Sequence, residues 1–300
     1  MDNELSKLMY QTLDISKDLV NLVMEYISEH VYYKEQEISL YWENVSDMKT
    51  HNNNVCVLGY INKKYCLDQI LIRSDDSNRF TISHNYRYFR SPIEMIEWRE
   101  KKEYIYSNSI IRVIEKHDFS YHQSFQYIKN CGEIKKFMIT KNYIIVHGKN
   151  HKILRINIEN HNIIKILKNK KQKDKFLNYD FYFYNEKIYL LSMVTKKILV
   201  YDAFMLSLDR IKTISIYNIS FESKKIRIII NDDIIYVNDG KKLLILDMDG
   251  RYVSNINYNN QTHVNLPFCV NDGKIYLSTK RKILVYNQKR KYKRINYPSI

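Results

Sequence analysis

Short apolar runs separated by polar turns fill residues 139–300, and one arrangement of them is repeated. Close copies span residues 183–202, 229–247 and 269–287, and a looser copy spans residues 139–157. In each copy a polar turn leads into a run of the Ile-Tyr-Leu type, a second turn follows, and a run of the Ile-Leu-Val-Tyr type ends on Asp or Asn. Because the runs are short, rich in β-branched and aromatic residues and bounded by turn formers, they predict strands joined by hairpins.

The spacing of the copies indicates the kind of repeat. Their second runs close at Asn157, Asp202, Asp247 and Asn287, which are 45, 45 and 40 residues apart. A period of roughly 40 to 50 residues that contains only strands is typical of a β-propeller, whose blades are four-stranded antiparallel sheets. One blade cannot bury both of its faces alone, so neighbouring blades pack on each other and the ring closes without a long exposed edge. The closing Asp or Asn is expected to form the following turn rather than to take part in catalysis.

Two weaker copies precede these four. The first begins at residues 55–58 and is interrupted at residues 74–78 and 86–88, and the second spans residues 93–114. Counting both predicts six blades over residues 51–300, at about 42 residues each, and the same spacing leaves five or seven blades open. We therefore expect an all-β protein, a six-bladed β-propeller, preceded by a short helical segment.

The helical segment is predicted over residues 1–34, and the propeller over residues 35–300. Within the helical segment, apolar residues recur at the i, i+3, i+4, i+7 and i+8 positions of one helix face. These are the candidate partner-binding residues: Leu19, Leu22, Val23, Tyr26 and Ile27.

Residues 15–27 resemble the opening of an F-box, the helical module that docks onto the Skp1 adaptor of a cullin ubiquitin ligase. The matching positions are Ile15, Ser16, Asp18, Leu19, Val23, Met24 and Ile27. The Pro of the family is Ser16 here, its Glu is Asp18, and the later helical part of the module gives way to a strand-like sequence at residues 37–42. The resemblance implies a Skp1-type partner. A helix that packs on the propeller as a lid explains the same apolar face.

The residues that follow change from the helical to the strand period. Ile38, Leu40 and Trp42 alternate with polar residues, which predicts a half-buried strand. Such a strand would pair with the last blade and close the ring, while closure from the C-terminal side is equally open. The polar residues 51–54 are the candidate boundary.

The chain is strongly basic, with a formal net charge of +15 and a pI of about 9.3. Such a charge favours polyanionic partners through counterion release. The bias toward Lys, Asn, Ile and Tyr also indicates an AT-rich genome, which raises the Lys count independently of function. Two basic stretches would contact nucleic acid, through Lys168, Lys170, Lys171, Lys280, Arg281, Lys282, Lys289 and Arg290. A solvated loop at residues 168–175 and a protected edge strand at residues 289–294 are the alternatives.

Motifs for catalysis and cofactor binding are missing from the sequence. It contains no glycine-rich nucleotide loop, no nucleophile elbow and no metalloprotease motif. The 4 cysteines are irregularly spaced, which predicts reduced thiols in a cytoplasmic protein. No apolar run approaches the roughly 20 residues that a membrane span needs. We therefore expect no catalytic residue, no metal site, no cofactor and no membrane partner.

The blade sequences resemble those of the loose six-bladed propellers of the NHL type. With the N-terminal helix and the codon bias, they also resemble uncharacterised F-box-like and propeller proteins of large DNA viruses. The resemblance implies a non-enzymatic scaffold in the cytoplasm, or in the host cytoplasm for a viral protein, whose propeller face binds a protein partner. One alternative is a basic propeller that binds nucleic acid or is a structural component of a virion. Another is a hydrolase with its site in the central channel.

Overall fold

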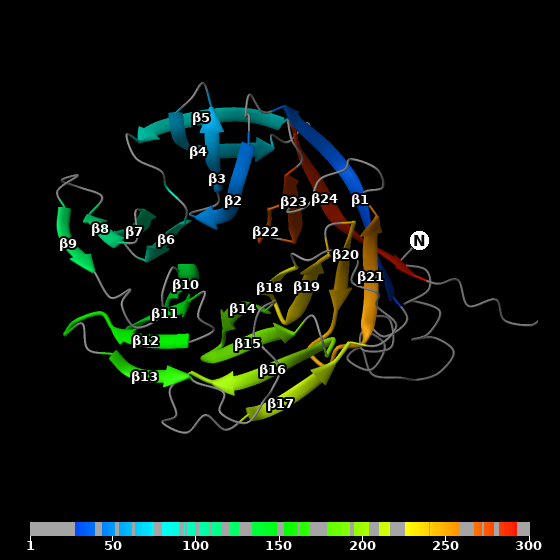
Figure 1. Ribbon diagram of the computed structural model, residues 1–300. Coiled ribbons are helices and arrows are strands. Elements are labelled where there is room, and N and C mark those ends of the chain that lie inside the picture. The colour runs from blue at the N-terminus through cyan, green and yellow to red at the C-terminus, as the bar shows by residue number, and fades with distance from the viewer. Residues whose placement is uncertain are drawn as a thin grey trace, which may run out of the picture.

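The protein is a ring of six four-stranded antiparallel sheets, which confirms the predicted all-β, six-bladed propeller (Figure 1). We describe it from a computed structural model. The described residues are 28–39, 44–51, 54–61, 64–74, 80–89, 93, 95–99, 102–107, 110–115, 121–125, 134–148, 153–160, 163–167, 179–192, 195–203, 210–216, 226–239, 241–257, 267–271, 273–278 and 282–292.

Each blade takes four strands, and five of the blades are continuous in sequence. Blade 1 contains β2 (Asn44–His51), β3 (Asn54–Ile61), β4 (Lys64–Ser74) and β5 (Phe80–Phe89). Blade 2 contains β6 (Met95–Arg99), β7 (Lys102–Ser107), β8 (Ile110–Glu115) and β9 (Tyr121–Phe125). Blade 3 contains β10 (Ile134–Ile139), β11 (Tyr143–Gly148), β12 (Ile153–Asn157) and β13 (Ile163–Leu167). Blade 4 contains β14 (Tyr179–Tyr184), β15 (Lys187–Ser192), β16 (Lys197–Asp202) and β17 (Arg210–Ser215).

The last two blades differ in how they are completed. Blade 5 contains β18 (Arg227–Asn231), β19 (Ile234–Asn238), β20 (Lys242–Leu246) and β21 (Tyr252–Asn257). Blade 6 contains β22 (Phe268–Asn271), β23 (Lys274–Ser278) and β24 (Lys282–Tyr292), and its fourth strand is β1 (Ser28–Ser39). The sheet order β1-β24-β23-β22 therefore joins the two ends of the described chain in one blade.

Closure of the ring through β1 confirms the N-terminal alternative at Ile38, whereas Leu40 and Trp42 of the predicted strand lie outside the described residues. The pairing of β1 with β24 runs from Ser28 opposite Tyr292 to Ser39 opposite Lys282. The predicted helical segment includes residues 28–34, but these residues are strand, because Val31, Tyr32 and Tyr33 favour extended backbone and pair with β24. The predicted boundary at residue 34 lies inside β1. The candidate partner-binding residues of the helix lie outside the described residues.

The first strand of each blade lies nearest the ring axis, and the fourth lies at the rim (Figure 1). The two middle strands of each repeat are the runs that the sequence shows most clearly, and they are buried on both faces. In β23 and β24, for example, Ile275 and Leu277 are fully buried, as is Ile283. Continuous apolar runs are expected for strands that are covered on both sides.

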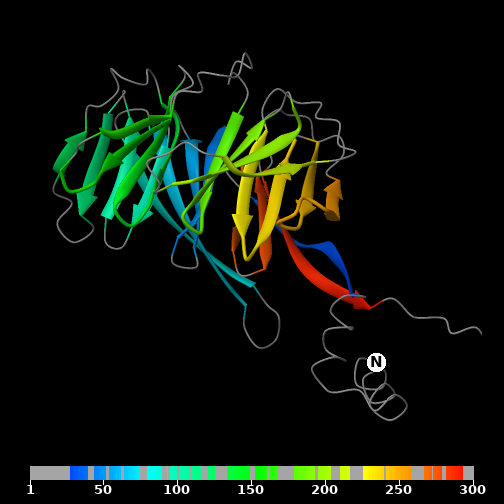
Figure 2. The same ribbon diagram turned by 90° about the horizontal axis from the view of Figure 1, so that it is seen from below.

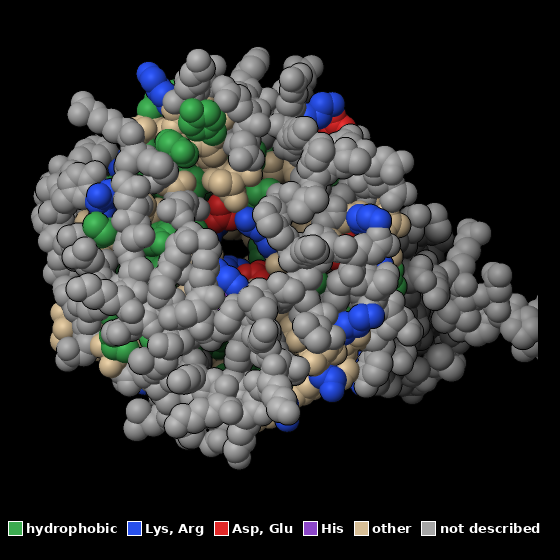
Figure 3. Space-filling model, viewed as in Figure 1, with side chains coloured by type: hydrophobic (Ala, Val, Ile, Leu, Met, Phe, Trp, Pro, Cys, Tyr) green, Lys and Arg blue, Asp and Glu red, His purple; other side chains and the backbone are tan. Residues whose placement is uncertain are grey.

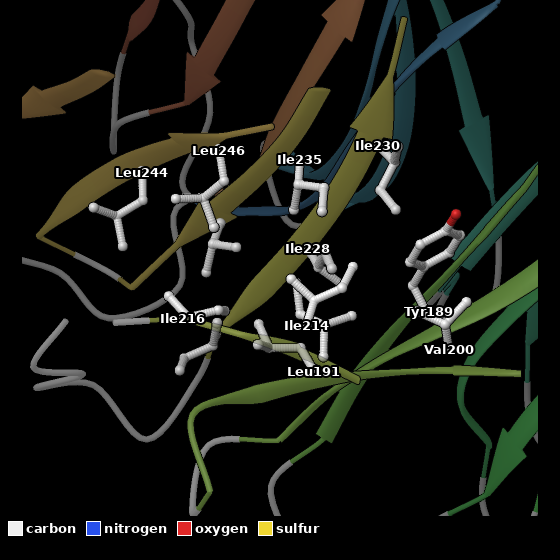
Figure 4. Close-up of a cluster of buried hydrophobic side chains, with 13 residues drawn as sticks. Tyr189, Leu191, Val200, Ile214, Ile216, Ile228, Ile230, Ile235, Leu244 and Leu246 are labelled. Carbon is white, nitrogen blue, oxygen red and sulfur yellow. The ribbon is translucent and has the colours of Figure 1, made fainter. Parts of the chain in front are cut away.

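The hydrophobic core consists of separate layers between neighbouring blades. Between blades 4 and 5, side chains of β15, β16 and β17 face those of β18, β19 and β20 (Figure 4). Leu191, Ile198, Ile228, Ile235 and Val237 in this layer have no exposed surface. Each such side chain contributes about 1.5–3 kcal/mol relative to exposure. A similar layer seals the joint between blades 6 and 1, so closure is stabilised by packing as well as by β1 pairing.

Asn and Asp residues form several of the turns. The loop between β18 and β19 consists of Asp232 and Asp233, at φ 48° and 56°, the positive values that a type I′ hairpin turn requires. Asn157 and Asp247 accept hydrogen bonds from backbone N–H groups of the turns that follow them. The turn-forming role is confirmed at both positions. The predicted interruption at residues 86–88 is wrong, because these residues continue β5.

Candidate functional site

Charged side chains of the innermost strands meet at the ring axis. We call this set the axial network, and Figure 3 shows acidic and basic side chains gathered beside the central hollow. Innermost strands converge there, so residues far apart in sequence come within contact distance. The axial network contains Asp47 and Lys49 of β2, Glu97 of β6, Lys136 of β10, Asp180 of β14 and Arg227 of β18.

One half of the network is centred on Asp47. Arg227 donates from Nη1 to Asp47 Oδ1 over 2.7 Å and from Nη2 to the carbonyl oxygen of Ser46 over 3.0 Å. Lys49 Nζ lies 3.9 Å from the other Asp47 oxygen and is hydrogen-bonded to Glu97. Since blade 6 separates blades 5 and 1 in the ring, the Arg227 pair links two innermost strands that are not neighbours.

The other half is centred on Asp180. Lys136 Nζ donates to both carboxylate oxygens of Asp180, over 2.9 and 3.0 Å. Asp180 Oδ2 also accepts the backbone N–H of Ile228 over 2.8 Å, which ties β14 to β18. The Lys136 ammonium lies 5.6 Å from the ring centroid of Phe181 and 5.8 Å from that of Tyr182, within the range of cation–π attraction.

The environment of the axis shifts the pKa values of Asp47 and Glu97 in opposite directions. Burial acts to raise the pKa of Asp47, but the charges of Lys49 and Arg227 outweigh it and hold this pKa below its usual value. Burial raises the pKa of Glu97, and Lys49 offsets that only in part. Burial, with a contribution from Glu97, also raises the pKa of Tyr182.

The axial network is neutral and its charges are already paired. Three carboxylates face three cations, and each of the six groups contacts at least one opposite charge. Its contacts join the innermost strands of blades 1 to 5. In the part of the chain that the structure describes, no group of at least three His, Cys, Asp or Glu side chains could hold a metal ion. The arrangement is chemically suited to holding the blades together.

A second cluster lies at the rim of blade 1. His84, Tyr86 and Tyr88 alternate along β5 and so project from one face of this strand; we call them the β5 aromatic row. The ring centroids of His84 and Tyr86 are 5.5 Å apart at an interplanar angle of 3°, and those of Tyr86 and Tyr88 are 6.4 Å apart at 19°. Tyr86 is 37% exposed and Tyr88 is 53% exposed. Lys64 Nζ lies 5.8 Å from the Tyr88 centroid.

A buried carboxyl group anchors the β5 aromatic row. Asp68 of β4 is fully buried, and its Oδ2 lies 2.7 Å from His84 Nδ1. Burial raises the pKa of Asp68, while the contact with His84 acts against that increase. A buried acceptor that holds a ring nitrogen fixes the orientation of the imidazole. His84 is therefore set in one position, and Tyr86 stacks on it.

The opposite face of β5 is held against blade 2. Arg87 forms an ion pair with the buried Glu103 of β7, which also accepts a hydrogen bond from Trp98 Nε1 over 3.3 Å. The Arg87 guanidinium lies 4.9 Å from the Phe89 ring centroid. One face of β5 is thus fixed to the ring, whereas the other presents its aromatic row.

The predicted basic site is described only at its C-terminal end. Lys282 is exposed, and its Nζ lies 2.6 Å from Glu37 Oε2, which joins β24 to β1. Lys289 and Arg290 belong to β24 and pair with Val31 and His30. The other residues predicted for nucleic-acid contact lie outside the described residues: Lys168, Lys170, Lys171, Lys280 and Arg281. The structure therefore places Lys282 in an inter-strand ion pair.

Neither the axial network nor the β5 aromatic row was singled out in the sequence. A usable signal was present, because Glu97, Lys136, Asp180 and Arg227 follow each other at intervals of 39, 44 and 47 residues. These intervals match the blade period, and each residue stands in the first strand of its blade. Charges that recur at the repeat period in an innermost strand are expected to meet at the axis.

Comparison with known proteins adds only the fold. No protein-family model and no curated protein sequence matches the chain. Among solved structures, BamB from Moraxella catarrhalis is similar at a TM-score of 0.51 and 9% identity, covering 90% of this chain and 100% of that one. Glutaminyl cyclase from Myxococcus xanthus has a TM-score of 0.45 and 9% identity, with 88% and 98% covered. The described residues contain no helix that is long and apolar enough to cross a membrane.

Proposed function

We propose that the protein is a non-enzymatic scaffold that binds a protein partner at the rim of blade 1. The observation that carries this proposal is the β5 aromatic row, where Tyr86 and Tyr88 are exposed side by side. Adjacent exposed aromatic side chains are characteristic of binding surfaces, because a partner gains large contact area at little cost in side-chain entropy. Other exposed large apolar residues among those described, Ile211 and Tyr252, stand singly on β17 and β21.

The axial network supports the scaffold role. Its ion pairs and hydrogen bonds connect five innermost strands, and its charges satisfy one another. A ring held in this way keeps its rim strands in fixed relative positions. A preorganised surface loses less conformational entropy when it binds.

The experiment compares two double variants that each remove two exposed apolar side chains. Tyr86→Ser with Tyr88→Ser disrupts the β5 aromatic row, and Ile211→Ser with Tyr252→Ser is the matched control. Each is used as bait in cell extract with and without nuclease treatment, and bound proteins are quantified by mass spectrometry against the unaltered chain. We expect specific partners to be lost from the first variant and retained by the second.

Three results would contradict this proposal. Retention of all partners by the β5 variant would exclude the row as the binding site, and equal loss from both variants would indicate non-specific adhesion. If nuclease removed every specific partner, the basic surface would be the functional feature and nucleic acid the partner.

The F-box resemblance gives the scaffold a second predicted contact. Purified Skp1 is tested against the full chain and against a chain that begins at Ser28, which retains β1 and hence ring closure. An adaptor role requires binding by the full chain alone. Equal binding, or none by either, would refute that role without bearing on the β5 aromatic row.

A further inference from the structure

We propose that the partner segment bound at blade 1 is an extended acidic peptide that adds to the outer edge of β5 as a fifth strand. This inference rests on the proposed function and specifies the chemistry of its partner. Strand addition uses backbone hydrogen bonds for affinity and alternate side chains for specificity.

The outer edge of β5 has the length that strand addition needs. β5 is 10 residues long and pairs along its whole length with β4, from Tyr65 opposite Phe89 to Ser74 opposite Phe80. No other described strand pairs with β5. Among the other rim strands of the described residues, β9, β13, β17 and β21 are 5 or 6 residues long, and only β1, with 12, is longer than β5. The β4–β5 pair also extends beyond the ring, on the same side as the β1–β24 pair (Figure 2).

The exposed positions of β5 lack the devices that usually keep an edge strand unpaired. Exposed edges are normally protected by charged side chains or Pro, or by being short. β17 follows this rule, because Arg210 and Lys212 are exposed on it. The exposed residues of β5 carry no Lys, Arg or Pro: Ser83, His84, Asn85, Tyr86 and Tyr88. An unprotected edge of this length is suited to receiving another strand.

The charge around the edge favours an acidic segment. Among the described residues, the carboxyl groups that contact β5 are those of Asp68 and Glu103; they are buried at 0% and 3% exposure and contact His84 and Arg87. Lys64 is exposed next to Tyr88. With a net charge of +15 on the whole chain, an acidic peptide is attracted, whereas a second copy of this chain is repelled.

The stacking within the row favours a peptide over single-stranded nucleic acid. Bases bind aromatic side chains face to face. Here the His84 and Tyr86 rings stack on each other, Tyr86 also stacks on Tyr88, and Lys64 lies over Tyr88. The ring faces already contact other side chains of the row or Lys64. The exposed ring edges and hydroxyls are suited to packing beside an added strand.

The test selects from a displayed library of random peptides of about ten residues, the upper length of a typical strand, on the intact protein. The best peptides are then synthesised, and their affinities are measured by fluorescence anisotropy. We expect sequences rich in Asp and Glu, a loss of affinity of about tenfold or more with the Tyr86→Ser, Tyr88→Ser variant, and no loss with the Ile211→Ser, Tyr252→Ser variant.

Two further measurements test the binding mode. Methylation of alternate peptide nitrogens should abolish binding, because it removes the donors of a strand ladder. Bound peptide should slow amide hydrogen exchange in β5 and leave β17 unchanged. Enrichment of basic peptides, absence of any enriched peptide, tolerance of methylation, or protection elsewhere would each overturn the proposal.

Binding of nucleic acid or of a second copy of this chain at β5 would give different results. Binding of a thymidine oligonucleotide that the tyrosine variant loses, or a dimer in sedimentation that this variant dissociates, would replace the acidic peptide and overturn the proposal. If the extract experiment succeeds but no peptide protects β5, the scaffold function stands and strand addition fails. If the tyrosine variant loses neither extract partners nor peptides, both fail.

Discussion

Replacing Asp47 with Asn removes the carboxylate that pairs with two cations at the ring axis while leaving its shape unchanged. Arg227 lies 2.7 Å from one Asp47 oxygen, and Lys49 lies 3.9 Å from the other. In the variant the Asn oxygen can still accept a hydrogen bond from Arg227, but the two cations lose their shared negative charge. We expect the folded state to be destabilised.

The size of the effect follows from the exposure of the three side chains. They are 14% exposed for Asp47, 22% for Lys49 and 33% for Arg227. Breaking a fully buried pair costs about 3–5 kcal/mol, and an exposed pair is worth about 0–1 kcal/mol. Because these side chains are partly exposed, we expect a loss of unfolding free energy between these two limits, about 2–3 kcal/mol. For 300 residues the entropy of unfolding near the midpoint is about 0.6 kcal/mol/K, so the melting temperature should fall by about 4 °C.

Glu97→Gln is the matched control, because Glu97 contacts the same Lys49 but has the opposite pKa shift. Burial of the ionised Glu97 carboxylate already costs free energy, which the raised pKa of this group reflects. Glutamine avoids that cost, and Lys49 retains Asp47. We therefore expect Glu97→Gln to change the stability at pH 7 by less than about 1 kcal/mol, in either direction.

The stability contributions of Asp47 and Glu97 also depend on pH in opposite ways. The pKa of Asp47 is lower in the folded state, so its contribution to stability is present above its unfolded pKa, about 3.9, and is lost as the pH falls through the folded value. The pKa of Glu97 is higher in the folded state, so its contribution is present below about 4.3 and is lost as the pH rises through the folded value.

Thermal unfolding followed by circular dichroism between about pH 2 and 8 tests this reasoning. The deficit of Asp47→Asn should be constant from pH 8 to about pH 5 and should shrink as the pH falls further. An unchanged melting temperature for Asp47→Asn at pH 7 would show that the axial pairs do not stabilise the ring. Equal losses for Asp47→Asn and Glu97→Gln would show that the assigned directions of the pKa shifts are wrong.

The turns and the ring closure give two further predictions. Gly250 has φ +83°, and an added Cβ would lie 2.4 Å from Ile214 Cγ2, whereas Gly273 has φ +69° and open space around it. In chemical denaturation, Gly250→Ala should therefore cost about 2–4 kcal/mol and Gly273→Ala about 1 kcal/mol, and equal costs would refute the steric argument. Removing residues 1–39 deletes β1 and exposes β24, so it should lower the melting temperature more than removing residues 1–27 does. A smaller effect of the longer deletion would show that β1 does not stabilise the ring.

The repeat was predictable from the sequence because the middle strands of each blade are chemically simple. Strands covered on both faces are continuous apolar runs, and turns that contain Asn or Asp separate them. The sequence therefore predicts two strands each in residues 183–202 and 229–247. The strand that closes the ring, β1, was predictable only in part. Alternation indicated a strand around Ile38, but the polar sequence at residues 28–30 has no strand pattern of its own. Its extended conformation is fixed by pairing with β24, which sequence periodicity does not report.

The two candidate sites were harder to predict because neither is local in sequence. Asp47 and Arg227 are 180 residues apart and meet only because innermost strands of different blades converge. The β5 aromatic row was hidden for a different reason. A sequence such as Tyr86-Arg-Tyr88 has no apolar face to mark it as core, so it predicts an interruption, although it lies inside β5 near the C-terminal end of this strand. Rim strands carry the weakest periodicity because solvent covers part of them.

The axis and the rim impose opposite requirements on polar and apolar side chains. At the axis, innermost strands converge and a charge must find an opposite charge, which the balance of three carboxylates and three cations provides. The excess positive charge of the chain therefore lies outside this network. At the rim, strands diverge and exposed aromatic rings are stabilised less by folding, since full burial of a side chain of this size is worth about 1.5–3 kcal/mol. Tyr86 and Tyr88 forgo much of that stabilisation in the isolated ring. A partner that covers them recovers it, which is why we assign binding to this strand.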